Sequence, residues 1–261
     1  MTGLTAEVFC KPYGGDKNGG DVYYLTSCAS GRISRVLLAD VTGHGQQVAE
    51  TADKLRSIMR QNVNVIRQSN LMAGINREFN AISEDGGFAT AVVATYFSPR
   101  QSLTVSIAGH PRPLLYQAKS RQWTAFGISD NAGSNLDPAL PFGILEETTY
   151  QTLQVAFTPG DMLLCHTDAF SEALDKSGNL LNSEGLIGIL NDLDEPENAI
   201  RWLHSQLEKY HADNLKNDDV TALLIRPTGN RISFKDNIKA AIRLVGRVTE
   251  IDSGDQRENL S

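Results

Sequence analysis

Five aspartates could assemble into one metal site, although they lie far apart in the sequence. Each is expected at the end of a strand or in the adjoining turn: Asp21, Asp40, Asp168 and the pair Asp218 and Asp219. An ionised carboxylate beside apolar strands is costly unless it is paired with a cation. Several converging carboxylates would also repel one another unless a metal supplied positive charge. These positions therefore predict a site for divalent cations.

The neighbours of these aspartates favour a metal over a salt bridge. No Lys or Arg lies within two residues of Asp21, Asp40 or Asp168, and Lys216 lies two residues before Asp218. Oxygen ligands select hard cations such as Mg²⁺ or Mn²⁺, and the sequence lacks the His and Cys spacing of a zinc site. A single aspartate at a strand end is more often a turn or cap residue. Only the whole set of aspartates therefore indicates a metal site.

Apolar runs predict the strands that must position these carboxylates. The run 36–39 is continuously apolar, as in a strand that is buried on both faces, and Ser30 and Gly31 suit the turn of a hairpin. Strands 114–117 and 122–126 are expected to continue the antiparallel meander that precedes them. The expected strands are 6–12, 21–27, 33–41, 88–97, 103–108, 114–117, 122–126, 149–157, 162–166 and 220–226.

Helical periodicity predicts two pairs of helices between these strands. Apolar residues recur at steps of three and four from Val48 to Ile66, and a second helix follows Asn70, which suits an N-cap. A further pair is expected at 183–191 and 196–211. Two antiparallel sheets stacked face to face, with a helix pair outside each, is the simplest way to bury these faces. The sequence therefore predicts an α+β fold, an αββα sandwich.

The sandwich is expected to form one domain over residues 1–228. The segment 229–261 carries apolar residues at helical spacing from Ile238 to Val245, beside a basic row, and a polar end. It is interpreted as a C-terminal helix and tail, either packed on the domain or free to bind a partner. The long loop 127–141, rich in Gly, Asn, Asp, Ser and Pro, has the length of many functional loops.

Composition excludes several classes of protein. The chain has 261 residues, a formal net charge of −7 and a pI of about 5.3, which argues against nucleic-acid binding. No apolar run is long enough to span a bilayer, and no secretory signal begins the chain. Cys10, Cys28 and Cys165 form neither a disulfide framework nor a metal clip and are expected to be buried thiols. The protein is expected to be soluble and cytoplasmic.

Six motifs then carry a resemblance to a known family. They are GGD at 19–21, ADVTGHG at 39–45, AGHPRP at 108–113, PFG at 141–143, TDAFSEA at 167–173 and NDDVT at 217–221. In this order they resemble the sporulation stage II E / RsbU-like branch of the protein phosphatase 2C (PPM) family, over roughly residues 5–227. The resemblance implies a metal-dependent serine/threonine phosphoprotein phosphatase with two Mn²⁺ or Mg²⁺ ions in a central cleft.

The same resemblance implies a role for each ligand. Asp40 would bridge both metals, and the backbone carbonyl of Val41 would bind one of them. Asp168 and Asp218 would hold the metal on the far side, with Asp219 beside it. Asp21 would complete the shell of the other metal, directly or through water.

Two positions depart from the family pattern. Tyr24 replaces the last aspartate of the usual Gly-Gly-Asp-x-x-Asp motif, which would weaken a contact around the metal. Ala169 follows Asp168 where glycine is usual, and alanine would cost on the order of 1 kcal/mol if that turn required a positive φ. Both departures slightly favour the alternative of a catalytically weak or inactive, phosphatase-like binding module.

Other candidates would support the metals or bind substrate. Thr42 stands where eukaryotic relatives carry the histidine proposed as general acid. His44, two residues later, could be that acid or could bond to the turn backbone. His110 replaces the aspartate of relatives that bind a third metal, so two metals are expected. Phosphate-binding candidates are Arg112 and Arg32. The candidates for supporting the metals or binding the substrate are therefore Gly20, Thr42, His44, His110 and Arg112.

The resemblance also implies partners. The substrate would be a phosphoserine or phosphothreonine of a regulatory protein, such as a STAS-domain anti-anti-sigma factor in a bacterial partner-switching pathway. Control by a separate protein, by the tail or by homodimerisation stays open. A different two-metal hydrolase, such as a nuclease, is disfavoured because the chain is acidic and has no basic stripe.

Overall fold

Two five-stranded antiparallel sheets stack face to face in the computed structural model, which describes residues 3–13, 19–28, 31–43, 46–83, 86–127 and 139–229. The first sheet has the order β1-β10-β9-β6-β7, and its strands are Leu4–Lys11, Val220–Pro227, Met162–His166, Leu114–Gln117 and Gln122–Ala125. The second has the order β2-β3-β4-β5-β8, with strands Asp21–Ser27, Ile33–Val41, Ala89–Phe97, Ser102–Ala108 and Leu153–Ala156.

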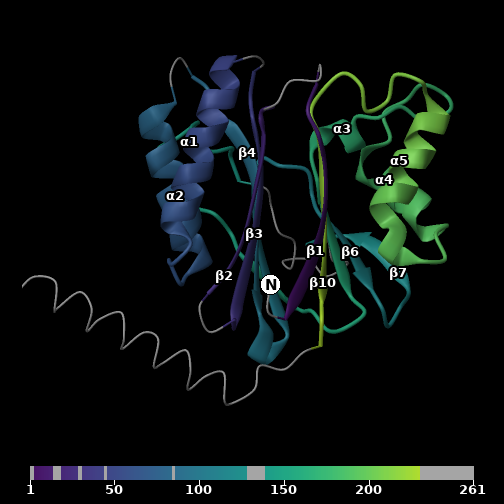
Figure 1. Cartoon of the computed structure of the whole chain (residues 1–261), viewed down its shortest axis with the longest axis horizontal. Helices are drawn as coiled ribbons and strands as arrows, with labels where there is room; N and C mark the ends of the chain where they lie inside the picture. The colour runs from purple at the N-terminus through teal and green to yellow at the C-terminus, as the bar shows by residue number, and fades with distance from the viewer. Residues whose placement is uncertain are drawn as a thin grey trace, which may run out of the picture.

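Helices cover the outer face of each sheet (Figure 1). α1 (Gln46–Asn62) and α2 (Gln68–Ile82) pack on the second sheet, and α4 (Asn182–Asn191) and α5 (Ala199–Tyr210) pack on the first. The short α3 (Asp168–Ser171) follows β9, and 3₁₀ turns occupy Ser98–Arg100 (η2) and Pro196–Asn198 (η3). The prediction of an αββα sandwich is confirmed.

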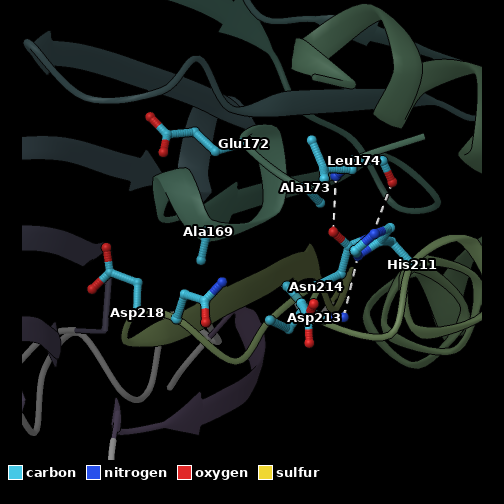
Figure 2. Close-up of a pocket in the computed structure, with 10 residues that line it drawn as sticks. Ala169, Glu172, Ala173, Leu174, His211, Asp213, Asn214 and Asp218 are labelled. Atoms are coloured by element: carbon cyan, nitrogen blue, oxygen red, sulfur yellow. Dashed lines mark hydrogen bonds between the residues drawn. The ribbon is translucent and has the colours of Figure 1, made fainter. Parts of the chain in front are cut away.

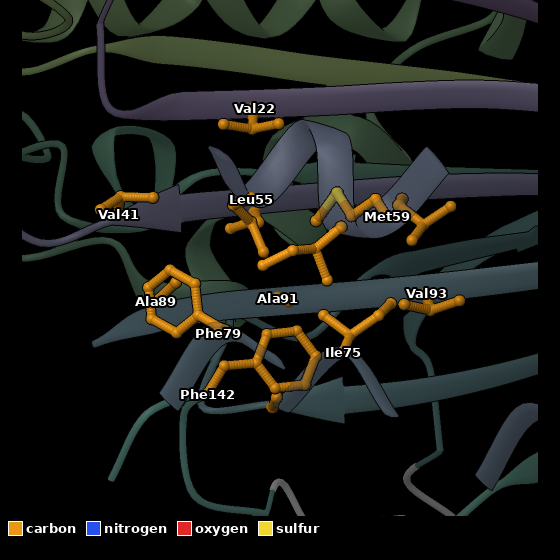
Figure 3. Packing of buried hydrophobic residues seen from close by; sticks show 14 of the residues in the cluster. Val22, Val41, Leu55, Met59, Ile75, Phe79, Ala89, Ala91, Val93 and Phe142 are labelled. Atoms are coloured by element: carbon orange, nitrogen blue, oxygen red, sulfur yellow. The ribbon is translucent and has the colours of Figure 1, made fainter. Parts of the chain in front are cut away.

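Strand alternation decides which side chains reach the space between the sheets. In β3, Leu37 and Ala39 pack under the helices, in the cluster that Figure 3 shows around Phe79 and Phe142. Val36 and Leu38 face the opposite sheet. Asp40 continues this second series, so its carboxylate points between the sheets at the end of the strand.

The predicted meander was wrong beyond β5. β6 and β7 belong to the other sheet, where β6 pairs with β9. The chain leaves the second sheet at Gly109, which has φ +62° and lies so close to Pro141 that a Cβ would overlap its ring. A two-residue period identifies the buried face of a strand but not its partner.

The predicted end of the first helix was also wrong. α1 ends at Asn62, and Ile66 is 83% exposed. Beyond this end, the guanidinium of Arg35, a buried residue of β3, donates hydrogen bonds to the carbonyl oxygens of Val63 and Val65. These hydrogen bonds stabilise the non-helical course of the chain after Asn62.

The second helix begins earlier than predicted, because Gln68 is its first residue and Asn70 therefore lies inside it. The amide of Gln68 is buried and donates to the carbonyl oxygen of Val93 at 3.0 Å and to Ser106 Oγ at 3.1 Å. This buried anchor, rather than a capping side chain, fixes the start of α2.

Three further expectations concern the cysteines, the membrane and the tail. Cys165 is buried, Cys28 is half-buried and Cys10 is exposed, so the expectation for Cys10 was wrong. Within the described ranges, no helix is both long and apolar enough to cross a bilayer. The expected tail helix lies outside the described residues, and the domain boundary at 228 stays a prediction.

Candidate metal centre

One end of the second sheet carries two of the aspartates. Asp21 begins β2 and Asp40 lies near the end of β3, and the two residues are direct cross-strand partners. Asp21 is only 8% exposed. Cross-strand partners place their side chains on the same face, so both carboxylates lie in the space between the sheets.

The first sheet brings the other three to the same end. β9 ends where its antiparallel neighbour β10 begins, which places Asp168 beside the pair Asp218 and Asp219. Two hydrogen bonds stabilise this junction. The amide of Thr167 donates to the carbonyl oxygen of Thr221, and the amide of Thr221 donates to the hydroxyl of Thr167, both at 3.0 Å. The ends of the two sheets that carry the aspartates both lie at the top of the view in Figure 1.

The environment of Asp21 disfavours its charge. The pKa of Asp21 is raised to about 8, chiefly by burial; the charges of Asp40 and Asp219 also act to raise it, while the hydroxyls of Thr221 and Thr167 act to lower it. Its Oδ2 is buried without a hydrogen-bond partner. A buried carboxylate oxygen in this state is costly unless a cation binds it.

The other carboxylates repel one another across the two sheets. Burial raises the pKa of Asp40 to about 7, and the charges of Asp168, Asp218 and Asp219 contribute. Burial also raises the pKa of Asp168, with contributions from Asp218 and Glu172. Among the described residues, no cationic side chain contributes to any of these shifts, so such a cluster favours a bound cation as the source of positive charge.

Divalent cations fit this donor set. The two ion pairs of the described ranges, Arg56–Asp53 and His204–Glu208, lie outside the cluster. Among the described residues, no three Asp, Glu, His or Cys side chains are close enough to hold an ion by themselves. Binding would therefore draw the carboxylates of the two sheets together, and backbone carbonyls or water would complete the shell.

Asp219 is engaged in a backbone clamp. Its Oδ1 accepts from the amide of Tyr13 at 2.7 Å, and its Oδ2 accepts from the amide of Gly20 at 2.5 Å. A Cβ on Gly19 would overlap this carboxylate, and one on Gly20 would lie 2.7 Å from the carbonyl oxygen of Val41. The two glycines allow the turn before β2 to approach both sheets, which positions Asp21.

Val41 and Thr42 differ in whether they could bind a metal. The carbonyl oxygen of Val41 lies against Gly20, at the end of β3 beside Asp40, where it could join a metal shell. The hydroxyl of Thr42 donates to the carbonyl oxygen of Phe88 at 2.9 Å and accepts from its amide at 3.2 Å. Thr42 thus fastens the end of β3 to the start of β4. His44 lies outside the described residues.

Two histidines lie behind the carboxylates. His110 is buried, and its Nδ1 lies 2.8 Å from the hydroxyl of Thr90, the cross-strand partner of Asp40. Burial lowers the pKa of His110 to about 3, with a contribution from His166, whose own pKa burial also lowers. Both rings are therefore neutral at physiological pH.

The two arginine candidates lie in different places. Arg112 donates to the carbonyl oxygen of Phe126 at 3.5 Å, and its role toward phosphate stays a prediction. Arg32 lies at the turn between β2 and β3, at the opposite end of the hairpin from Asp21 and Asp40. Six residue steps of strand separate these ends by about 20 Å, so the suggestion that Arg32 binds the phosphate was wrong.

The two departures from the family pattern leave the carboxylate cluster intact. Tyr24 packs with the cluster under α1 and α2, on the face of the sheet opposite Asp21. Ala169 is a helical residue of α3 and is not among the described non-glycine residues with positive φ. The anticipated strain at Ala169 is therefore absent.

A hollow of about 300 Å³ opens beside the cluster and was not predicted from the sequence. Figure 2 shows Asp218 and Glu172 on one side of it and the segment from His211 to Asn214 on the other. Asn214 builds the wall: its Oδ1 accepts from the amide of Leu174 at 2.8 Å, and its Nδ2 donates to the carbonyl oxygens of Leu174 and Leu207 at 2.9 Å. An Asn in a loop gives no sequence signal for these distant contacts.

Replacing Asn214 with Ala should lower the free energy of unfolding by about 2 kcal/mol, because it leaves backbone groups of Leu174 and Leu207 without partners. Urea denaturation would measure the change. Asn217→Ala, on the rim of the same hollow, is the matched control and should stay within about 0.5 kcal/mol of the wild type. Equal stability of Asn214→Ala and the wild type would show that the wall does not depend on this side chain.

Solved structures place this architecture among PP2C-type phosphatase domains. The RsbU and RsbW domains of Rv1364c from Mycobacterium tuberculosis superpose with a TM-score of 0.70 at 21% identity, covering 88% of this chain and 61% of that one. The PP2C domain of SpoIIE from Bacillus subtilis, with a fragment of its regulatory domain, superposes with a TM-score of 0.71 at 15% identity, covering 87% of this chain and 64% of that one. RsbX in complex with magnesium superposes with a TM-score of 0.62 at 16% identity, covering 86% of this chain and 96% of that one. The chain thus spans less than two thirds of the first two.

The family follows from the sequence. The model of the Stage II sporulation protein E (SpoIIE) family matches residues 30–228, about three quarters of the chain, and this protein belongs to that family. In a comparison with curated proteins, no sequence matched. Fold and family together define a PP2C-type phosphatase domain, as the motifs predicted.

Proposed function

We propose that the protein is a metal-dependent phosphatase that hydrolyses phosphoserine or phosphothreonine in a regulatory protein. One observation supports this most directly: carboxylates from two sheets converge at one end of the sandwich, and burial and mutual repulsion raise the pKa values of Asp21, Asp40 and Asp168. Such a set is matched to divalent cations rather than to a protein cation.

Each residue would then have a defined task. Asp40, between the two halves of the cluster, would bridge two Mn²⁺ or Mg²⁺ ions, with the Val41 carbonyl and Asp21 on one side and Asp168 and Asp218 on the other. Asp219 would keep the Gly19–Gly20 turn in place beside them. When bound, two such ions supply a nucleophilic water and offset charge on the phosphoryl oxygens.

A cysteine phosphatase mechanism does not suit this chain. Burial raises the pKa of Cys165 to about 12, so this thiol is not a thiolate at neutral pH. None of the three cysteines begins the Cys-x5-Arg loop of such enzymes. Hydrolysis by activated water requires no covalent intermediate.

The substrate is proposed from the relatives. Rv1364c joins an RsbU domain to an RsbW domain, and another structural neighbour comes from the bacterial stressosome. We infer that this chain acts on a phosphorylated, STAS-like regulator in a partner-switching pathway, under the control of a second protein or of its own dimerisation.

Metal removal tests the activity. Wild-type protein should hydrolyse p-nitrophenyl phosphate and a phosphoserine peptide with Mn²⁺ or Mg²⁺, and EDTA should abolish turnover because the carboxylates alone cannot activate water. Readdition of Mn²⁺ after EDTA should restore the rate. A folded protein without turnover under any of these metals would instead support a phosphatase-like binding module.

A further inference from the structure

The hollow beside the carboxylates shares one residue with the proposed active site. Asp218, a proposed metal ligand, lines it together with Ala169 and Glu172 of the α3 region. The charge of Glu172 also raises the pKa of Asp168. A substrate whose phosphoryl group lay at the metals would therefore place a neighbouring side chain at this hollow. Its volume of about 300 Å³ is at the small end of ligand sites, which suits one side chain.

The lining of the hollow is strongly acidic. Glu172, Asp213 and Asp218 are among the residues that line it, and none of the described Lys or Arg residues does. His211 is the one lining side chain with an ionisable nitrogen, and its Nδ1 accepts a hydrogen bond from the amide of Asp213 at 3.3 Å. Neither the Glu172 nor the Asp213 carboxylate takes part in an ion pair of the described ranges.

The floor and wall suit a long cationic side chain. Ala173, Leu174 and Leu215 provide apolar surface. The methylene stem of a lysine or arginine can pack on such a surface while its charged end contacts polar groups. The hydrogen bonds of Asn214 to Leu174 hold this wall before any ligand arrives (Figure 2). The hollow is thus preformed, which lowers the entropic cost of binding.

We propose that this hollow binds a lysine or arginine side chain of the phosphoprotein substrate, close in space to the phosphorylated residue. The proposal rests on the proposed function. It predicts selectivity as well as affinity, because the same carboxylates repel an acidic residue at that position. The metals would attract the phosphoryl group while Glu172 and Asp213 select the sequence around it.

The test is a charge scan of phosphoserine peptides. Lysine or glutamate is placed singly at each of the three positions on either side of the phosphoserine, and the ratio of kcat/KM for the Lys and Glu peptides is measured. At one position or more, the wild type should favour lysine by about fivefold or more, as expected for partly exposed charges. This preference should shrink at high ionic strength.

Two variants separate charge from structure. Glu172→Gln with Asp213→Asn should bring the ratio to within about twofold of unity, and Glu172→Lys with Asp213→Lys should invert it. Asp194→Asn is the control, because it removes an exposed acid that does not line this hollow but a separate one, beside Arg201 and Trp202, and should keep the wild-type ratio. A wild type without a lysine preference, or a preference unchanged by the charge swap, would overturn the proposal.

Failure of the proposed function would look different. A wild type that does not hydrolyse p-nitrophenyl phosphate with Mn²⁺ contradicts the phosphatase activity, not the hollow. Fluorescence anisotropy of the same peptides then tests the hollow directly. Tighter binding of the lysine peptides that the charge swap reverses would support it, and equal binding of lysine and glutamate peptides would refute it.

Discussion

Asp40→Asn is expected to reduce Mn²⁺-dependent hydrolysis of p-nitrophenyl phosphate by at least about a hundredfold. Asp40 is the cross-strand partner of Asp21, and its pKa responds to Asp168, Asp218 and Asp219, so it lies electrostatically between the two halves of the cluster. Loss of groups that only support a ligand already costs roughly 10–100-fold. Steady-state kinetics over a Mn²⁺ titration would measure the loss.

The same substitution should stabilise the metal-free protein. Folding raises the pKa of Asp40 from 3.8 to about 7, so the folded state favours its protonated form. The stabilisation of the folded state by protonated Asp40 is fully present below pH 3.8 and is lost as the pH rises through about 7. At pH 8 the buried charge destabilises the wild type, whereas asparagine carries none. In EDTA at pH 8 we expect Asp40→Asn to unfold with a free energy higher by on the order of 1–2 kcal/mol.

Two controls make this result specific. The stability difference should shrink at pH 5, where Asp40 of the wild type is largely protonated, and Asp194→Asn should change neither activity nor the pH dependence. Turnover within tenfold of the wild type would remove Asp40 from the metal centre. An Asp40→Asn protein that is less stable than the wild type in EDTA at pH 8 would contradict the electrostatic account.

Local patterns in the sequence were sufficient for most of the architecture. The bounds of β2, β3, β6 and β9 agree with the predicted strands, because apolar alternation and flanking turn residues are properties of a short stretch of chain. The same alternation correctly placed Asp40 at the end of an apolar strand. Once the sheets stack, such strand ends meet, which is why the carboxylates could be grouped before the structure was known.

Features that depend on distant partners could not be predicted. The transfer of β6 to the other sheet depends on its pairing with β9, about fifty residues later. The non-helical course of the chain after Asn62 is stabilised by Arg35, although an arginine within an apolar strand was a usable signal of a buried anchor. The hollow depends on Asn214, whose contacts with Leu174 cross forty residues.

The role of Asp219 shows the same limit within the site. Sequence alone grouped it with the metal ligands, whereas its two oxygens accept hydrogen bonds from the backbone amides of Tyr13 and Gly20, about 200 residues earlier. Such a clamp leaves no local pattern beyond the two glycines that it requires. Direct metal coordination by Asp219 stays a prediction, and its clamp is open to a separate test.

Gly19→Ala provides that test and should have a large effect. An added Cβ would overlap the Asp219 carboxylate, which cannot move without releasing the amides of Tyr13 and Gly20. Overpacking against a fixed group costs typically 1–3 kcal/mol, and we expect a value near 3 kcal/mol because hydrogen bonds are also lost. Since Gly20 precedes Asp21, activity should fall at least about tenfold. Guanidinium denaturation and phosphatase assays would measure the two effects.

Gly188→Ala is the matched control, because Gly188 lies on the exposed side of α4 and a Cβ there would meet no atom within 4 Å. Alanine is favoured over glycine in a helix, so this variant should gain about 0.5–1 kcal/mol and keep full activity. The opposite signs of the two Gly→Ala changes would separate steric conflict from backbone entropy. A Gly19→Ala protein with wild-type stability and turnover would mean that the Asp219 clamp does not position the turn before Asp21.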